Sequence, residues 1–261
     1  MAYDYEGFKG AIWKLTQIDL SAYKENQMKR RIDTLIKKHG ISGYDAFVNE
    51  IKSNKELFEE FVNYLTINVS EFYRNPDQWE LMDNTFIPEL MERFGSRNLK
   101  IWSAACSTGD EPYSLVMALS RHIPLHAIKI LATDLDKQVI AQAKTGLYAE
   151  KSIAAVPADL REKYFTKIGN SYKISDAIKA RVEFKQHNLL KDPYPEKCHM
   201  IVCRNVLIYF TEEAKAEVYD KFNEALIDQG ILFIGSTEQI MNHKAHGYDR
   251  RNSFYYQKAA N

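Results

Sequence analysis

The chain has 261 residues, 45% of them hydrophobic, with 35 basic and 35 acidic side chains and a formal net charge of zero. This length suffices for one large domain, or for a small and a medium one. The neutral balance argues against a general nucleic-acid binder.

The sequence also argues against export, membrane insertion and a metal centre. It has no apolar run of about 18 residues and no signal-peptide pattern at its start. Cys106, Cys198 and Cys203 cannot all pair and lack zinc-site spacing, so reduced thiols and no bound metal are expected. These features predict a cytoplasmic location without direct membrane insertion.

Apolar residues at helical spacing predict an all-helical first part of the chain. Three such faces are Tyr5, Phe8, Ile12 and Leu15, then Tyr44, Phe47, Val48 and Ile51, then Leu57, Phe58, Phe61 and Leu65. Between them, residues 23–39 form a further predicted helix whose other side is basic, with Lys24, Arg31 and Lys38 seven residues apart. That side is either a solvated face or a docking surface for an acidic partner.

Helical periodicity fails at Thr66–Arg74, which is expected to be extended or looped. Asn75-Pro76 predicts a turn and a helix start, and the helix that follows is expected to kink or split at Pro88. We therefore expect an N-terminal helical domain (1–75), a helical linker (76–98) and a second domain (99–261).

The second domain is organised around residues 99–113, a short apolar strand, a loop of small side chains and a helix opening at Asp110-Glu111-Pro112. Strands alternating with helices from here on predict a parallel α/β sheet. Ligands bind at the carboxyl ends of such strands. The loop lacks a G-x-G-x-x-G pattern and its helix starts with two acids, so a ligand with a positive end is favoured over a phosphate.

Polar residues at further strand ends extend this predicted site. Asp134 follows the second strand, where a carboxylate commonly accepts hydrogen bonds from a ribose diol. The sheet is expected to resume at 187–190 and 200–203. Asn188, in the first of these stretches, and Asn205, just past the second, are expected at strand ends, where they would contact a base and the ligand backbone. Tyr209 is either a core aromatic residue or a functional one.

Three further regions complete the expected layout. Residues 146–184 interrupt the alternation and predict a small inserted subdomain with short strands near 172–174 and 181–184. A helix capped by Thr211 is expected to end at Gly230, followed by strands at 231–235 and, at the sheet edge, 252–257. Arg74 either pairs with Glu71 or, in its polar non-periodic stretch, serves the site.

Four stretches together resemble the CheR-type chemotaxis receptor methyltransferases. They are T-I-N-V-S-E-F-Y-R-N at 66–75, W-S-A-A-C-S-T-G-D-E-P-Y-S at 102–114, A-T-D-L-D at 132–136 and C-R-N-V-L-I-Y-F at 203–210. The resemblance spans nearly the whole chain. It implies an all-α N-terminal domain followed by a class I S-adenosylmethionine-dependent (Rossmann-like) α/β domain with an inserted β subdomain at about 146–185.

The resemblance also implies the site residues and the chemistry. Cofactor contacts would be made by Asn68, Ser70, Arg74, Glu111, Asp134, Asn188, Leu189, Asn205 and Val206, and Arg74 and Tyr209 would be catalytic. S-adenosylmethionine would donate a methyl group to glutamate side chains in the cytoplasmic helical bundle of chemoreceptors, leaving S-adenosylhomocysteine. If the basic side of the helix at 23–39 is a docking surface, Lys24, Arg31 and Lys38 would guide this substrate, and a monomer is expected.

Three alternatives remain at this point. One is a methyltransferase for another substrate, such as a small carboxylic acid or a nucleic acid. A nucleotide-binding oxidoreductase is disfavoured by the missing glycine pattern, and the third is a non-catalytic cofactor-sensing or scaffold module.

Overall fold

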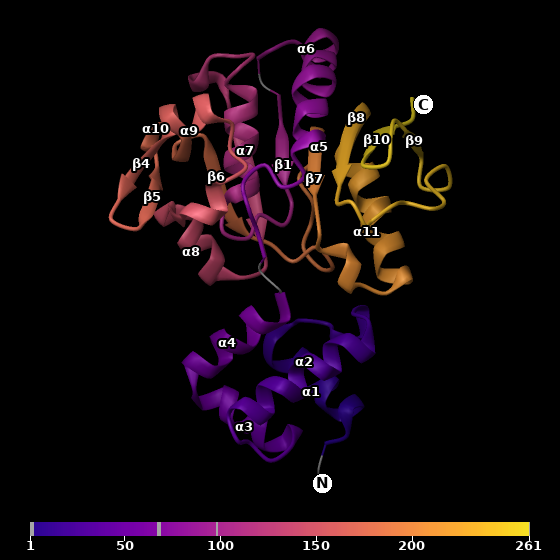
Figure 1. Ribbon diagram of the computed structural model, residues 1–261. Coiled ribbons are helices and arrows are strands. Elements are labelled where there is room, and N and C mark those ends of the chain that lie inside the picture. Colours follow the sequence, from indigo (N-terminus) through magenta and orange to yellow (C-terminus); the bar gives the residue numbers. More distant parts are fainter. Residues whose placement is uncertain (1–2, 67–68, 98, 261) are drawn as a thin grey trace. The chain divides into compact units, whose positions relative to one another are not determined.

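The computed structural model describes residues 3–66, 69–97 and 99–260 (Figure 1). It divides into two compact units. One holds residues 3–66 and 206–217, and the other holds residues 69–205 and 218–260. No helix among these described residues is long and apolar enough to cross a membrane.

The first unit contains the predicted N-terminal helices. They are α1 (Tyr5–Thr16), α2 (Glu25–Lys38), α3 (Tyr44–Ser53) and α4 (Lys55–Thr66), with a 3-10 turn η1 (Leu20–Ala22). Their apolar faces meet in an aromatic core, where the Phe47 and Phe61 rings lie 5.5 Å apart and Phe8 packs against both. The same unit includes the 3-10 turn η5 (Leu207–Tyr209), whose Tyr209 carbonyl accepts a 2.8 Å hydrogen bond from the Lys24 amide.

A seven-stranded sheet forms the centre of the second unit, in the order β6-β2-β1-β7-β8-β10-β9. The strands are β6 (Val182–Gln186), β2 (Ile130–Asp134), β1 (Ile101–Ser103), β7 (Cys198–Cys203), β8 (Leu226–Ile234), β10 (Tyr255–Lys258) and β9 (Tyr248–Arg250). Neighbours from β6 to β8 are parallel, whereas β10 is antiparallel to both β8 and β9. This mostly parallel sheet confirms the predicted α/β class.

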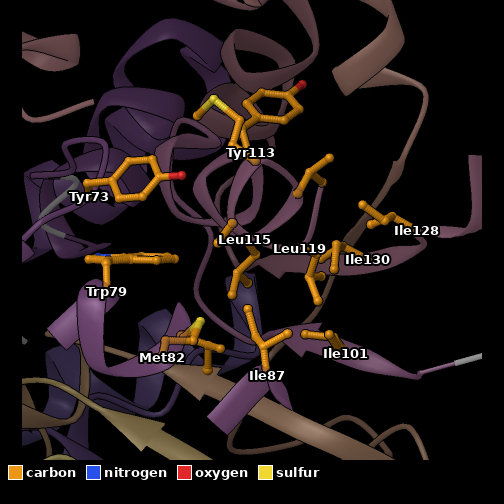
Figure 2. Packing of buried hydrophobic residues seen from close by; sticks show 14 of the residues in the cluster. Tyr73, Trp79, Met82, Ile87, Ile101, Tyr113, Leu115, Leu119, Ile128 and Ile130 are labelled. Atoms are coloured by element: carbon orange, nitrogen blue, oxygen red, sulfur yellow. The ribbon is translucent and has the colours of Figure 1, made fainter. Parts of the chain in front are cut away.

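Helices cover this sheet. They are α5 (Pro76–Leu81), α6 (Ile87–Phe94), α7 (Asp110–Leu119), α8 (Lys137–Thr145) and the part of α11 (Glu212–Ala225) from Val218 on, with a 3-10 turn η3 (Leu125–Ala127). The main core lies where α5, α6 and α7 meet the strands, and Figure 2 shows Trp79 and Ile87 beside Leu115 and Ile101.

The helix expected to kink or split at Pro88 is irregular before this residue, but its backbone stays right-handed helical from α5 to α6. A π-helical turn, η2 (Met82–Phe86), joins α5 to α6 just before this proline. Proline has no amide hydrogen and its ring crowds the preceding turn, which favours such a local widening. Pro76 stands at the start of α5 after Asn75, whose φ of 61° is left-handed. Asn75 avoids the right-handed helical region, as residues before proline tend to do.

A small antiparallel sheet, β3-β5-β4, forms the inserted subdomain. Its strands are β3 (Leu147–Ala149), β5 (Ser171–Ile174) and β4 (Phe165–Ile168), accompanied by η4 (Glu150–Ile153), α9 (Ala158–Tyr164) and α10 (Asp176–Lys179). The prediction of a strand at 181–184 inside this subdomain is wrong, because β6 pairs in parallel with β2 of the main sheet. As an edge strand, β6 alternates half-buried and exposed residues and so resembles a hairpin strand in sequence.

Three strand and helix ends differ from the predictions. The sheet does not resume at 187–190, since β6 has already ended at Gln186. Helix α11 ends at Ala225 instead of Gly230. Gly230 lies within β8, where a Cβ would come 2.9 Å from the Ile227 carbonyl oxygen and 3.1 Å from that of Cys198, so close packing explains this glycine. The strand expected at 252–257 exists as β10, but β9 rather than β10 is the edge strand of the sheet.

Candidate functional site

The loop at 104–109 follows β1 and is fastened to both neighbouring strands. The Ala104 amide donates to the Val202 carbonyl at 2.8 Å, and the Cys106 amide donates to the Thr133 carbonyl at 2.9 Å. Gly109 has a φ of 92°, and a Cβ there would lie 2.9 Å from side-chain atoms of Ala143 and Tyr113. The small residues therefore let the chain turn sharply at the carboxyl ends of the strands.

Asp134 is buried at the end of β2, as predicted, and faces this loop. Its Oδ2 accepts a 2.8 Å hydrogen bond from the Ser107 amide, and its Oδ1 accepts one of 3.0 Å from the Asp136 amide. Burial raises the pKa of this carboxyl to about 6, which these backbone hydrogen bonds partly oppose. A carboxylate has further acceptor positions, which suits it to bind a diol.

Two acidic side chains open α7 and are both buried. Glu111 Oε1 accepts a 2.8 Å hydrogen bond from the Ser103 hydroxyl, and burial raises its pKa to about 7, although Arg204 draws it downward. Asp110 is bound by the Thr108 hydroxyl at 2.5 Å and by Ser70. Among the described residues, neither Glu111 nor Asp110 has a cationic side chain within 4 Å. Buried carboxyls without such a partner suit a cationic group of a ligand.

Residues 69–75, the described part of the motif at 66–75 and from here on called the linker, are attached to this helix. Ser70 binds Asp110, and the Tyr73 amide donates a 3.1 Å hydrogen bond to the Ser114 hydroxyl of α7. Arg74 is half-buried, and within the described residues its side chain makes one hydrogen bond, of 3.3 Å, to the Val69 carbonyl. Asn68 lies outside the described residues.

Two site residues were missed by the sequence analysis, Arg204 and Glu238. The Arg204 guanidinium donates to the Arg74 carbonyl and to Asn75 Oδ1, both at 2.8 Å. Glu238 Oε2 accepts from the amides of Asn205 at 2.7 Å and Gly235 at 2.8 Å. A buried carboxylate thus joins the ends of β7 and β8. The signal for Arg204 was present in the C-R-N-V motif, whereas Glu238 follows a strand without any periodic pattern.

The predicted base-contacting residues have structural partners as well. Asn188 Oδ1 accepts a 2.9 Å hydrogen bond from the Leu190 amide and so shapes the turn after β6. Leu189 is buried, and its carbonyl accepts from the Tyr194 hydroxyl at 2.7 Å. Asn205 holds a left-handed φ of 61°. Their roles toward a cofactor stay predictions.

Burial raises the pKa of two thiols in this unit, Cys106 and Cys203, and four carboxylates raise it further. Asp134, Glu111 and Asp110 all raise the pKa of Cys106, while Glu238, Glu111 and Asp134 raise that of Cys203, in both cases after the larger effect of burial. The described part of the second unit therefore brings most predicted cofactor contacts to the carboxyl ends of β1, β2, β7 and β8. Left-handed backbone at four non-glycine positions, Tyr73, Asn75, Ser107 and Asn205, marks the same region.

Five predicted residues belong to the other unit. Val206 precedes η5, Tyr209 is its last residue, and the Tyr209 side chain is half-buried. Lys24 is exposed before α2. Arg31 donates from Nε and Nη2 to the Tyr64 carbonyl, at 3.1 and 2.6 Å, and Lys38 pairs with Glu60 at 2.6 Å. Two of the three predicted docking residues therefore also bind α4.

Comparison with known proteins identifies the family. Residues 68–253 match the family described as "CheR methyltransferase, SAM binding domain", and residues 3–66 match "CheR methyltransferase, all-alpha domain". The chain belongs to the CheR methyltransferase family. It is therefore a methyltransferase of the chemotaxis protein methyltransferase family with S-adenosylmethionine as cofactor, and its fold is an all-α domain followed by a class I α/β domain.

Relatives match along nearly the whole chain. A "Chemotaxis protein methyltransferase" of Listeria monocytogenes is 39% identical over 98% of this chain and 97% of its own length. "Chemotaxis protein methyltransferase 1" of Pseudomonas aeruginosa is 33% identical over 92% of this chain and 91% of its own. Among solved structures, a TehB-like SAM-dependent methyltransferase from Corynebacterium glutamicum is 15% identical, with a TM-score of 0.39, over 70% of this chain and 94% of its own.

The buried polar groups fit this cofactor. Asp134 offers a carboxylate for the ribose hydroxyls, and Glu111 offers one for the ammonium of the methionine part. The amide of Ser107 binds Asp134, and the hydroxyl of the same residue is buried without a hydrogen-bond partner among the described residues. A buried hydroxyl without a partner is typical of a site that binds a polar ligand.

Proposed function

We propose that this protein methylates glutamate side chains of chemoreceptors, giving glutamate methyl esters. The observation that carries the proposal is its similarity, over 98% of the chain, to a protein named a chemotaxis protein methyltransferase. The proposed substrate is the glutamate-bearing cytoplasmic helical bundle of the receptors, the location is the cytoplasm, and the enzyme acts as a monomer. Nucleic acid is not a proposed substrate, since the chain has no net positive charge.

The chemistry requires orientation more than proton transfer. A glutamate carboxylate has an ordinary pKa of about 4.3, so it is ionised at neutral pH and can attack without a general base. When bound, the cofactor supplies an electrophilic methyl group on a sulfonium. Alignment of two reactants in a water-poor site contributes several kcal/mol, on the order of 7 to 11 in ideal cases.

Each proposed role follows from a side chain's chemistry. Glu111 and Asp134 hold the two ends of the cofactor, and Ser70, Asn188, Leu189, Asn205 and Val206 make further contacts to it, together with Asn68. Arg74 binds a carboxylate, either that of the cofactor or that of the incoming glutamate, because a guanidinium matches a carboxylate in a bidentate pair. Tyr209 lines the transfer site and orients the nucleophile.

The test is a methyl-transfer assay with purified protein, methyl-labelled S-adenosylmethionine and purified receptor cytoplasmic fragments. We expect base-labile label on the receptor fragment, since methyl esters hydrolyse in alkali. Fragments whose acceptor glutamates are replaced by alanine are the substrate control, and Asp134→Ala is the enzyme control. Label on a small acid or on RNA, with none on any receptor fragment, would show that the substrate assignment is wrong.

A further inference from the structure

Arg204 is a buried cation at the carboxyl edge of the sheet. It follows Cys203, the last residue of β7, and only 8% of it is exposed. Its guanidinium carbon lies 4.6 Å from the centre of the Phe233 ring and 5.8 Å from the centre of the Trp79 ring. Aromatic faces on β8 and α5 therefore hold the guanidinium in one place.

Within the described residues, the two hydrogen bonds of this guanidinium go to Arg74 and Asn75 in the linker. Nη2 of Arg204 donates to the Arg74 carbonyl and to Asn75 Oδ1, each at 2.8 Å. Trp79 Nε1 donates to the same carbonyl at 3.0 Å. Two donors on one carbonyl fix the peptide that joins Arg74 to Asn75, at the place where Asn75 takes its left-handed φ of 61°.

Stability alone is a poor explanation for this arrangement. In the described part of the chain, no carboxylate lies within 4 Å of Arg204, and its Nε has no hydrogen-bond partner. A charge buried on neutral acceptors contributes little or nothing to stability, because its desolvation opposes the hydrogen bonds. Among the acidic groups, Glu111 has the largest electrostatic effect on Arg204, and Glu111 belongs to the proposed cofactor site.

We propose that Arg204 is a positioning residue for Arg74. By binding the Arg74 carbonyl and the Asn75 side chain, it fixes the direction in which the Arg74 side chain leaves the linker. In this proposal Arg204 acts through the backbone of Arg74 and the side chain of Asn75, not on the cofactor or the substrate. This inference rests on the proposed cofactor contact of Arg74, but it does not depend on the identity of the methyl acceptor.

Calorimetric titration of the full chain with S-adenosylhomocysteine tests this without any methyl acceptor. We expect Arg74→Ala to weaken binding by at least tenfold and Arg204→Met to weaken it by about tenfold. Methionine keeps an apolar stem against Phe233 and Trp79 and removes both hydrogen bonds. If Arg204 acts through Arg74, the double variant Arg74→Ala/Arg204→Met binds no more weakly than Arg74→Ala alone.

Matched variants separate positioning from general damage. Arg181 also has a buried, unpartnered Nε and donates to a carbonyl, that of His126 at 3.2 Å, but it precedes β6 at the opposite end of the strands. Arg181→Met should leave the affinity unchanged. Asn75→Gly permits the left-handed φ but removes the Oδ1 acceptor of Arg204. It should weaken binding when Arg74 is present and have no further effect in Arg74→Ala. Asn75→Asp keeps an Oδ1 acceptor and should bind normally.

Several results would overturn the inference. These are wild-type affinity in folded Arg204→Met, losses that multiply in the double variant, or an equal loss in Arg181→Met. If Arg204→Met does not fold, unchanged affinity in Asn75→Gly overturns it instead. Wild-type affinity in Arg74→Ala removes Arg74 from the cofactor site and this inference with it, whereas receptor methylation is judged separately by transfer of label.

Discussion

The Ser107 amide donates a 2.8 Å hydrogen bond to Oδ2 of Asp134, so the loop after β1 and the end of β2 share one carboxylate. Asp134 thereby holds the loop, and in the proposed function it also binds the ribose of the cofactor. The two tasks can be separated by changing the ligand as well as the protein.

The first prediction concerns ribose recognition by Asp134. Asp134→Ala should weaken S-adenosylhomocysteine binding by about 1.5 to 3 kcal/mol, roughly 10- to 150-fold, because a hydrogen bond to a charged group is lost. Calorimetry on folded protein measures this loss. The 2′-deoxy analogue of the ligand should bind the wild type weakly but should lose nothing further in the variant. If removal of the 2′-hydroxyl lowers the affinity by the same factor in the wild type and in Asp134→Ala, Asp134 does not bind that hydroxyl and acts only on the loop.

The second prediction concerns the charge of Glu111. Its pKa of about 7 means that the free protein holds a proton there at mildly acidic pH, which an ammonium ligand must displace. Affinity for S-adenosylhomocysteine should therefore fall by up to about tenfold per pH unit below about pH 7. Calorimetry between pH 6 and 7.5 measures this change in affinity. Glu111→Gln should bind more weakly at every pH, and its affinity should depend less on pH.

The same group gives an opposite trend for the stability of the free protein. The pKa of Glu111 is raised from 4.5 in the unfolded chain to about 7 in the folded one, so the folded state binds the proton more tightly. Its contribution to the free energy of unfolding is therefore lost as pH rises through this window. Urea unfolding at pH 5.5 and 7.5 should show a smaller difference in Glu111→Gln than in the wild type. An identical pH dependence in both proteins would contradict the raised pKa.

Most of the fold was predictable because local pattern and tertiary structure agree. The N-terminal helices, the strand and loop before Asp110, and the caps of α8 at Asp136 and Gly146 follow from side-chain spacing and backbone preference. The errors lie where position in the sheet changes the pattern. β6 alternates because it is an edge strand, and Gly230 is required by packing in β8 rather than by a helix end.

The site was predictable in part, for a related reason. Asp134 and Glu111 stand beside recognisable strand ends and helix starts, so local pattern placed them at one edge of the sheet. Glu238 and Arg204 act through partners 33 and about 130 positions away, Asn205 and the linker at 74–75. Such contacts arise only from the topology, which no local window contains.

The third prediction concerns the loop that the cofactor approaches. Gly109→Ala should lower the free energy of unfolding by more than about 1 kcal/mol, since it combines a left-handed φ with contacts of 2.9 Å to Ala143 and Tyr113. Gly169→Ala is the control, because Gly169 also has a positive φ, 58°, but nothing lies within 4 Å of its added Cβ. Urea unfolding should give the larger loss for Gly109→Ala. Equal decreases in the free energy of unfolding for the two variants would mean that Ala143 and Tyr113 move to make room for the added Cβ.

The last prediction concerns the docking surface, defined by Lys24, Arg31 and Lys38. Arg31 is a poor choice for reversal, because its guanidinium binds the Tyr64 carbonyl and lies 4.8 Å from the centre of the Tyr64 ring. Lys24 and Lys38 are exposed, and although Lys38 also pairs with Glu60 at 2.6 Å, within the described residues it makes no buried contact of the kind that Arg31 makes. Lys24→Glu/Lys38→Glu should raise the KM for receptor fragments and weaken its salt dependence, since exposed charges act mainly on association.

The matched control for this double reversal is Lys14→Glu/Lys52→Glu, on α1 and α3. It makes the same change in net charge within the same unit, at residues that are also exposed. Both double variants should bind S-adenosylhomocysteine as the wild type does. A specific docking surface requires a KM effect at low salt from the first pair only. If both pairs raise KM equally, the attraction comes from net charge, and if neither does, the basic side of α2 is only solvated.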